Sequence, residues 1–508
     1  MAGILNAPRL LRIGGGTAAR RILSSPLASP TDHRDVNPSW RALPIETGIS
    51  GVDWPVVPKP RPAVVLGMLF QLEHSQWWPV EEMERHQLGQ LSKMLDHAAA
   101  TVPFYGPRLR ETGWTPGGRI TAEQWGRMPV LRRAELQAAG VQDSGNALLS
   151  RAVPADHGTQ FPLFTSGSTG RPVHTVGTAL TQLFWTCLTL RDHLWHARDF
   201  SQKLAVIRQL NRPSPSTEGS VAPNWGSATD GVLRTGPAAI LDIVHTVRQQ
   251  AQWLGAQQPG YLLTYPSNVM ALARHFAEAG ERLPGLLEVR TFGEVVEPRT
   301  RDACRAAWGV PLVDMYSSQE VGYVALQCPG HEHYHMQSEN LLVEVVDDDG
   351  HPCPPGSVGR VLVTTLHNFA TPLLRYEVGD FAEVGPPCPC GRGLPVLTRV
   401  LGRQRNMLTM PDGDQKWPVF REPAEMQAAT GVDLPPFQQF QVIQRSLTAL
   451  EVMLVTPRAL GPEEEAVMRG YLEITLGHRF DVTFSYVEEI PRSAGGKFED
   501  FKSELEGP

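Results

Sequence analysis

Apolar residues recur along the chain at helical spacing in several places. Within residues 83–100 and 179–197 they return every three or four positions, which predicts helices with one buried face. Thr121, placed before "AEQWGRM", predicts the capped start of a further helix. The N-terminal part of the chain therefore contains several helices.

In the middle of the chain, short apolar runs alternate with helical patterns. The segment "YLLTYPSNVMALARHFAEAG" predicts a short strand, a turn at Pro266 and Ser267, and a helix that ends at Gly280. The segments "LEVRTFGE" and "VPLVDMYSSQE" each predict a strand that leads into a loop. This alternation predicts an α/β region with largely parallel strands. Ligands in such folds bind at the carboxyl ends of the strands, where these loops lie.

Beyond residue 340 the pattern changes. The segment "NLLVEVVDDDGHPCPPGSVGRVLVTTL" predicts a β-hairpin with a turn at 347–350, and "LEVMLV" and "DVTFSYVEEI" predict strands that flank a helix near 462–475. We place a domain boundary at "VLGRQRN", residues 400–406. The chain shows no internal repeat.

The expected architecture is an α/β fold in two domains. A large N-terminal α/β domain of several subdomains, with mostly parallel sheets, is expected over residues 63–401, and a small mobile α+β domain over residues 402–508. Residues 1–62 are rich in proline, glycine and serine and predict a loose tail or a strap over the surface.

Composition narrows the class of partner. The chain has 508 residues, of which 41% are hydrophobic and 19% charged, as in ordinary globular proteins. The formal net charge is −7 without a sustained basic stripe, so neither nucleic acid nor an acidic membrane surface is an expected partner. No uncharged apolar run is long enough to predict a membrane span. Residues 1–31 faintly resemble a transit peptide, with a disordered leader as the alternative, and we expect a cytoplasmic protein.

The segment "FTSGSTGRPVHT", residues 164–175, has the composition of a phosphate-binding loop. Glycines let backbone N–H groups converge on an anion, and hydroxyl groups add donors. The residues concerned are Thr165, Ser166, Gly167, Ser168, Thr169 and Gly170. Such turns are also common without ligands. Arg171 and Pro172 stand where a Walker-type loop carries lysine, so the source of the positive charge is an open question.

Six cysteines stand at positions 187, 304, 328, 353, 388 and 390. Without an apolar signal segment, a disulfide framework is not expected, and metal ligation or free thiols are the better interpretations. Cys328 and His331 form a C-x2-H pair, and Cys388 and Cys390 form a C-x-C pair, which together fit a closed tetrahedral Zn²⁺ site. The rival ligands are His333 and His335. Free thiols with exposed histidines are the alternative.

An ordered set of short motifs follows the glycine-rich loop. The set comprises "MYSSQE" (315–320), "RYEVGDF" (375–381), "LGR" (401–403) and "PRSAGGKF" (491–498). Together they resemble the adenylate-forming superfamily of acyl-CoA synthetases, stand-alone adenylation enzymes and luciferase-like proteins. The segments "LDHAAATVPFYGPRL", "MPVLRRAEL", "TFGEVVEP" and "CPCGR" make the resemblance closest to the phenylacetate–CoA ligase branch, which includes capsule-gene relatives. It covers roughly residues 80–508.

The resemblance implies a reaction and assigns residues to it. A carboxylate joins the α-phosphate of ATP and expels pyrophosphate, so two anions must meet. The glycine-rich loop would hold the β- and γ-phosphates, and Glu320 would hold Mg²⁺. Asp380 would accept hydrogen bonds from the ribose hydroxyls, and Arg403 would lie near ribose and phosphate at the hinge. The other matches to nucleotide-binding positions are Gly293, Glu294, Tyr316, Ser317, Ser318 and Gln319.

The resemblance also names the missing cation. Lysine is scarce in this chain, occurring at positions 59, 93, 203, 416, 497 and 502. Lys497 matches the catalytic lysine, whose ammonium would touch the substrate carboxylate and the α-phosphate. Because Lys497 is carried by the small domain, adenylation would require that domain to close. The small domain would then rotate, and a nucleophile would attack the acyl-adenylate.

Three interpretations of function follow. The first is ATP-dependent activation of a carboxylic acid, aromatic by resemblance, and acyl transfer to a thiol, with coenzyme A as the expected acceptor. The second passes the acyl-adenylate to a carrier-protein thiol in trans or to an amine. The third is a nucleotide-binding partner protein that has lost catalysis, since Arg405 and Asn406 replace acids usual at the hinge. Ser317 in place of glycine and Val173 in place of lysine are smaller departures.

The acid itself is not identified by these motifs. We expect the side chains that line the acyl pocket within residues 225–295, where Trp225, Tyr261 and Tyr265 are candidates. Aromatic residues in such positions are more often part of the core.

Overall fold

The computed structural model describes most of the chain, and every structural statement below concerns these residues. They are 43–139, 147–164, 174–210, 216–403, 407–413, 415–416, 418, 435, 439–492 and 498–505. The chain divides into two units, residues 1–43 and 44–508, so the description concerns almost entirely the second. The phosphate-loop residues 165–173, the hinge positions 404–406 and Lys497 lie outside the described residues.

Five helices lie between residues 60 and 139. They are α1 (Pro60–Ser75), α2 (Val80–Thr101), α3 (Tyr105–Glu111), α4 (Ala122–Gly126) and α5 (Arg133–Ala139). The expected cap at Thr121 is present, because its side chain accepts the N–H of Gln124 at the start of α4. Tyr105 is fully buried and donates its hydroxyl hydrogen to the carbonyl of Pro372, which ties α3 to the sheet.

A short hairpin and a long helix come next. The hairpin is β1 (Gln160–Phe164) and β2 (His174–Thr178), a two-stranded antiparallel sheet, and the helix is α6 (Ala179–Trp195). A one-turn 3-10 helix, Ala155–His157, precedes β1. The α6 prediction is confirmed, with Thr178 and Thr181 forming its capping box.

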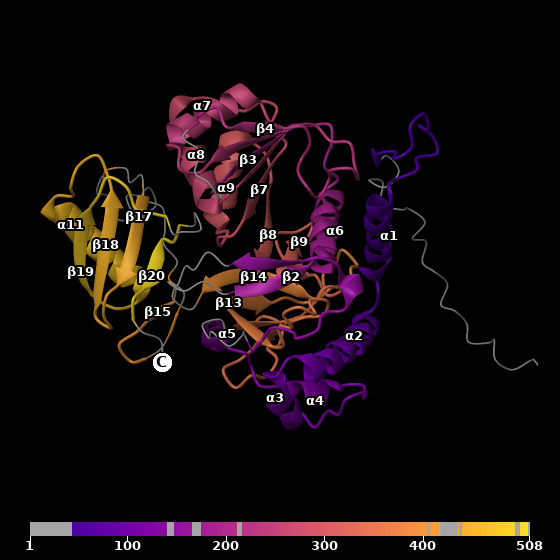
Figure 1. The fold of residues 1–508 in the computed structure, drawn as a ribbon. Coiled ribbons are helices and arrows are strands. Elements are labelled where there is room, and N and C mark those ends of the chain that lie inside the picture. The colour runs from indigo at the N-terminus through magenta and orange to yellow at the C-terminus, as the bar shows by residue number, and fades with distance from the viewer. Residues whose placement is uncertain are drawn as a thin grey trace, which may run out of the picture. The chain divides into compact units, whose positions relative to one another are not determined.

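One half of the large sheet is built from parallel strands. They are β3 (Leu204–Arg208), β5 (Ala238–Asp242), β6 (Tyr261–Thr264), β7 (Glu288–Phe292) and β8 (Leu312–Ser318), with β4 (Ser220–Ala222) antiparallel at the edge. The helices α7 (Val247–Gln257), α8 (Pro266–Ala279) and α9 (Pro298–Trp308) pack beside them (Figure 1). Gly280 ends α8 in a left-handed conformation, as expected.

The other half of the large sheet is antiparallel. Its strands are β9 (Gly322–Gln327), β10 (Tyr334–Met336), β11 (Leu341–Val346), β12 (Val358–Thr365), β13 (Tyr376–Val384) and β14 (Val396–Arg403). The twelve-stranded order is β11-β12-β13-β14-β10-β9-β8-β7-β6-β3-β5-β4. The α/β class is confirmed, but the parallel arrangement holds only from β3 to β8. Beyond β8 the strands are joined without crossover helices, and such connections produce antiparallel pairs.

A second, smaller sheet lies near the C-terminus. Its order is β19-β18-β17-β20, and its elements are β17 (Gln439–Gln444), β18 (Ala449–Val455), α11 (Pro462–Leu476), β19 (Asp481–Tyr486) and β20 (Phe501–Ser503). The strands β15 (Leu408–Thr409) and β16 (Gln415–Lys416) form a short pair before it. This sheet has its own apolar core against α11. The limits 63–401 and 402–508 stay predictions.

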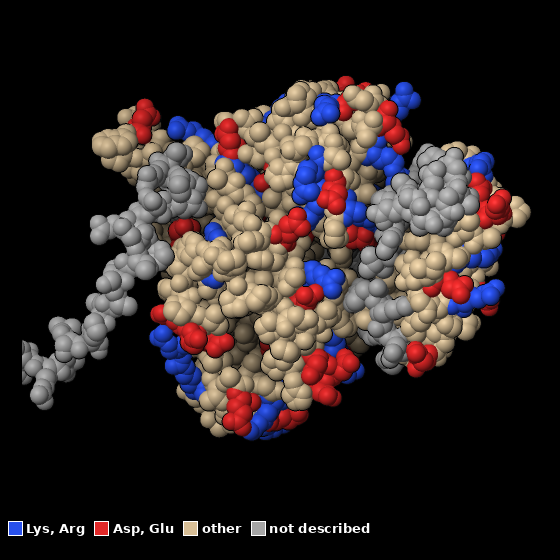
Figure 2. All heavy atoms as spheres, turned by 180° about the vertical axis from the view of Figure 1, so that it is seen from behind, with Lys and Arg blue, Asp and Glu red and all other residues tan. Residues whose placement is uncertain are grey.

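Two surface properties bear on partners. On the face drawn in Figure 2, basic and acidic side chains are interspersed, so no extended field of one sign covers the described part of this face. None of the described helices combines the length and apolar character that crossing a bilayer requires.

Candidate active site

The carboxyl end of β8 brings predicted nucleotide-binding residues together. The hydroxyl of Tyr316, on β8, donates a 2.8 Å hydrogen bond to Oδ2 of Asp380, on β13. Asp380 pairs with Arg403 across β13 and β14, so the two residues are direct neighbours along the backbone register. Tyr316, Asp380 and Arg403, which the sequence places far apart, therefore share one edge of the sheet.

The end of β8 also carries the predicted magnesium residue. Ser317 and Ser318 are partly buried, and Gln319 is exposed. Ser318 Oγ is buried and has no hydrogen-bond partner among the described residues. An unsatisfied buried hydroxyl of this kind fits a site that a polar ligand such as a nucleotide completes.

Glu320 is buried and has a basic partner that the sequence analysis did not single out. Arg133 stands at the start of α5. Its Nη1 atom lies 3.2 Å from Glu320 Oε1 and 3.4 Å from the hydroxyl oxygen of Tyr376. The side chains of Arg133 and Glu320 are 17% and 8% exposed, so the guanidinium offsets the cost of burying the carboxylate. A carboxylate at this position is the hard oxygen ligand that Mg²⁺ prefers.

The predicted phosphate loop falls between the two strands of the β1–β2 hairpin. Phe164 at the end of β1 pairs with His174 at the start of β2. Thr165, Ser166, Gly167, Ser168, Thr169 and Gly170 stand in the connection between them, outside the described residues.

Gly293 and Glu294 form the turn after β7. Gly293 has a φ of +82°, a conformation that favours glycine. The Glu294 carboxylate accepts hydrogen bonds from two backbone N–H groups, that of Ser267 at 2.9 Å and that of Phe498 at 2.6 Å. Arg492 Nη1 lies 3.5 Å from Glu294 Oε1. Burial raises the pKa of Glu294, while Arg492 and the two N–H groups oppose the rise.

These contacts join the C-terminal segment to the large sheet. Arg492 and Phe498 are the described residues on either side of 493–497, and both contact Glu294. An ion pair between Arg299, on α9, and Asp500 adds a further link. The described residues that flank positions 493–497 therefore both lie beside the turn after β7.

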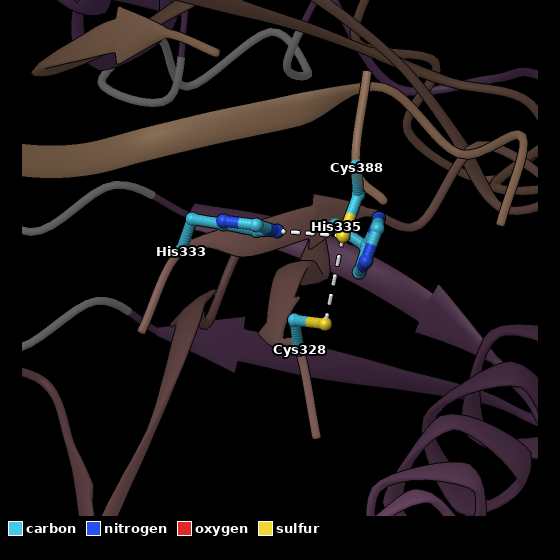
Figure 3. A group of neighbouring side chains, drawn as sticks. All are labelled: Cys328, His333, His335 and Cys388. Carbon is cyan, nitrogen blue, oxygen red and sulfur yellow. Dashed lines mark hydrogen bonds between the residues drawn. The ribbon is translucent and has the colours of Figure 1, made fainter. Parts of the chain in front are cut away.

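A cluster of cysteines and histidines lies at the turn between β9 and β10, with His335 on β10 (Figure 3). One ligand atom from each of Cys328, His333, His335 and Cys388 lies within 4.8 Å of the others. The Sγ atoms of Cys328 and Cys388 are 3.8 Å apart, and His333 Nε2 is 3.0 Å from Cys388 Sγ. Tetrahedral Zn²⁺ with bonds of about 2.3 Å to sulfur separates two thiolates by about 3.8 Å. The spacing of these side chains thus fits zinc.

The group of possible metal ligands contains His333 and His335. The sequence pattern had instead favoured His331 and Cys390 as ligands, together with Cys328 and Cys388. His331 is exposed in the turn before β10, stacked on the His333 ring at 4.9 Å. His333 and His335 are two residues apart, and extended chain directs such side chains to the same side. Cys390 is outside the group, although its Sγ lies 3.4 Å from His335 Nε2.

His335 has the protonation state and orientation of a metal ligand. Its Nδ1 donates to the carbonyl of Leu394 at 3.2 Å, so Nε2 carries the lone pair, with Cys390 Sγ 3.4 Å away. Burial lowers the pKa of His335 to about 4, so the ring is neutral near neutral pH. His335 therefore belongs to the cysteine–histidine cluster, with Cys390 and Leu394 beside it.

The aromatic candidates for the acyl pocket are core residues. The Trp225 indole N–H donates to the carbonyl of Gln202 at 2.8 Å, and its ring lies 5.3 Å from that of Tyr261. The Tyr261 hydroxyl accepts the N–H of Asp199, and Tyr265 packs against Phe292 at the end of β7. These three side chains pack against neighbouring residues.

The α/β fold, with one large mixed sheet and a smaller C-terminal sheet, is similar to the fold of solved CoA ligases. In a solved structure of 2-hydroxyisobutyryl-CoA ligase, in the postadenylation state with 2-HIB-AMP, 91% of the chain aligns with 85% of this one at a TM-score of 0.64 and 20% identity. A structure of that ligase with 2-HIB-AMP and CoA in the thioesterification state aligns at 0.54, again with 20% identity, over 92% of its chain and 85% of this one.

The relatives with similar sequences are phenylacetate-coenzyme A ligases. The phenylacetate-coenzyme A ligase of Thermus thermophilus is 28% identical over 356 residues, which are 67% of this chain and 74% of the relative. That of Escherichia coli is 24% identical over 440 residues, or 82% of this chain and 94% of the relative. The family described as the CapK C-terminal domain matches residues 435–504. The resemblance to the phenylacetate–CoA ligase branch is confirmed.

Proposed function

We propose that this protein is an AMP-forming acid–thiol ligase. It activates a carboxylic acid, aromatic by the names of its relatives, with ATP, and then transfers the acyl group to coenzyme A. The observation that carries the proposal is the 2.6 Å hydrogen bond from Phe498 N–H to Glu294 Oε1. It supports a lysine at position 497 that acts beside the nucleotide-binding edge of the sheet.

In the first half-reaction, a carboxylate oxygen of the acid attacks the α-phosphorus of ATP. The bond from that phosphorus to the bridging oxygen breaks, and pyrophosphate leaves with the electron pair. The Lys497 ammonium lowers the repulsion between the two anions most strongly in the transition state. Asp380, held by the hydroxyl of Tyr316, orients the ribose. Glu320 would hold Mg²⁺, which would supply positive charge to stabilise the leaving pyrophosphate.

In the second half-reaction, the coenzyme A sulfur attacks the acyl carbonyl carbon. The carbon–oxygen bond to AMP breaks, AMP leaves, and the thiol proton passes to solvent. The residues of the first half-reaction on the small domain must withdraw before this step, because one site serves both. A carrier-protein thiol or an amine could replace coenzyme A in the same step.

The zinc site is a separate, structural part of the proposal. Cys328, His333, His335 and Cys388 would hold the metal with four protein ligands and no open position. Such a site pins the turn between β9 and β10 to the hairpin that carries Cys388.

The proposal is tested by acid-dependent exchange of labelled pyrophosphate into ATP over a broad panel of acids. We expect exchange with at least one aromatic acid and its loss in Lys497→Ala. Product analysis with coenzyme A, amines and candidate carrier proteins then identifies the acceptor. Absence of exchange with every acid of the panel would instead favour a nucleotide-binding protein without catalysis.

A further inference from the structure

A cavity of about 150 Å³ lies beside Glu320. Its walls come from β1, α6 and the start of β9, including Phe161, Trp185 and Tyr323. It lies outside residues 225–295, where the sequence analysis expected an acyl pocket. Because Glu320 lines it directly, anything bound in the cavity is adjacent to the magnesium residue.

The size and walls of the cavity suit one aromatic ring. The rings of Trp185 and Tyr323 lie 5.0 Å apart and tilted, so they form an aromatic corner. Gly322 has a φ of +85°, and a Cβ there would come within 3.4 Å of Trp185. An apolar cavity of about 150 Å³ holds a benzene ring in other proteins.

Polar groups without protein partners also line the cavity. Asn340 is 8% exposed, and within the described part of the chain its side-chain amide makes no hydrogen bond. Its backbone N–H donates to the carbonyl of Gln337, and its backbone carbonyl accepts the N–H of Leu366. Gln182, on α6, likewise presents an amide without a partner among the described residues. Neither amide is among the fully buried unpaired atoms, so both are accessible from the cavity and can pair with a hydrogen-bonding substituent of a ligand.

The electrostatics of the cavity favour a neutral substituent. Among its described lining residues there is no lysine or arginine, and Glu320 is the one carboxylate. His367 Nε2 lies 3.0 Å from the carbonyl of Glu339, and its ring stacks on Phe184 at 4.1 Å. Burial lowers the pKa of His367 to about 4, so it is neutral as well. A second carboxylate on the ligand would have no counter-charge here.

We propose that this cavity binds the acyl part of the activated acid, and that the acid is a single aromatic ring bearing a hydroxyl or amino group paired by Asn340. Asn340 is then a specificity-determining residue. An amide suits either substituent, because it offers both a donor and an acceptor. This inference rests on the proposed ligase function, and names the substrate class that the same site selects.

The test compares substituted and unsubstituted acids on the full-length protein. Pyrophosphate exchange would be measured with benzoate, phenylacetate and their hydroxy and amino derivatives, using wild type, Asn340→Ala and Asn340→Leu. Wild type should have a KM for its best substituted acid roughly tenfold or more below that of the parent acid. The variants should raise the KM of the substituted acid roughly 10- to 100-fold, while the parent acid changes by no more than about threefold.

The same acids titrated calorimetrically separate this inference from the proposed function. Exchange that is indifferent to the substituent and to Asn340 overturns the inference and leaves the ligase function intact. Binding of substituted acids that needs Asn340, without exchange, supports the cavity's selectivity and overturns the ligase function. If the variants do not fold, the wild-type comparison alone decides, and equal KM values for substituted and parent acids overturn the inference.

Discussion

Replacing Glu294 by glutamine should slow acid adenylation and spare the second half-reaction. The Glu294 side chain is 6% exposed and holds the segment that carries Lys497 through Phe498 N–H and Arg492. Glutamine keeps one acceptor oxygen but loses the charge, so the variant forfeits a charge-assisted hydrogen bond worth about 1.5–3 kcal/mol. If closure of the segment limits adenylation, this corresponds to roughly a 10- to 100-fold slower step, since 1.4 kcal/mol is tenfold.

The assay measures both half-reactions separately. Acid-dependent pyrophosphate exchange reports adenylation, and transfer from a synthetic acyl-adenylate to coenzyme A reports the second step. Glu332→Gln is the matched control, because Glu332 is 63% exposed and its ion pairs with Arg301 and Arg305 are distant, at 3.6 and 3.9 Å. It should behave as wild type.

The pH dependence sharpens the prediction for Glu294. Burial raises the pKa of this carboxyl, so it becomes protonated at a higher pH than an exposed glutamate. The ratio of wild-type to Glu294→Gln exchange should be largest above that raised pKa and should shrink as the pH falls through it. Equal exchange by wild type and variant at alkaline pH, or an equal loss of both half-reactions, would refute the reasoning.

Three further predictions concern the surrounding structure. Arg133→Leu should lower the free energy of unfolding by about 3 kcal/mol, because it leaves Glu320 buried without a partner. Mg²⁺–ATP should raise the melting temperature of this variant more than that of wild type, and an equal or smaller rise would contradict the pairing. Elemental analysis should find one zinc per chain, lost in Cys388→Ser but retained in the control Cys353→Ser; no stoichiometric zinc in wild type rules the site out. Burial raises the pKa of Asp314 to about 6, so wild-type stability relative to Asp314→Asn should fall by up to about 3 kcal/mol as the pH rises from about 4 to above 6. Thermal unfolding across this range checks it, and a constant difference between the two proteins would contradict it.

Local sequence signals predicted the elements well. Thr121 and Gly280 mark a helix start and a helix end by cap chemistry that depends on few neighbours. Tyr316, on β8, contacts Asp380, on β13, so two of the predicted nucleotide-binding residues lie together, while their role in binding stays a prediction. The antiparallel half was less evident, because pairing depends on connections rather than on the apolar pattern of each strand.

The missed residues depend on contacts over long sequence separations. Arg133 meets Glu320 only through folding, because the two are 187 positions apart in sequence, and nothing local marks Arg133 as a partner. His333 and His335 were not missed but were named only as rival ligands, although their spacing of two places both on one side of extended chain. Asn340 has no sequence signal, since its proposed role depends on its place in the wall of the cavity beside Glu320, which only the fold creates.

The central claim is that a lysine on the small domain reduces the repulsion between the two reacting anions, the substrate carboxylate and the α-phosphate of ATP. The most direct measurement compares the two half-reactions of Lys497→Ala under identical conditions. Pyrophosphate exchange should fall by roughly 100-fold or more, as for loss of a charge-stabilising group, while acyl transfer from synthetic adenylate to coenzyme A stays within about threefold of wild type. Exchange at the wild-type rate in this variant would contradict the account.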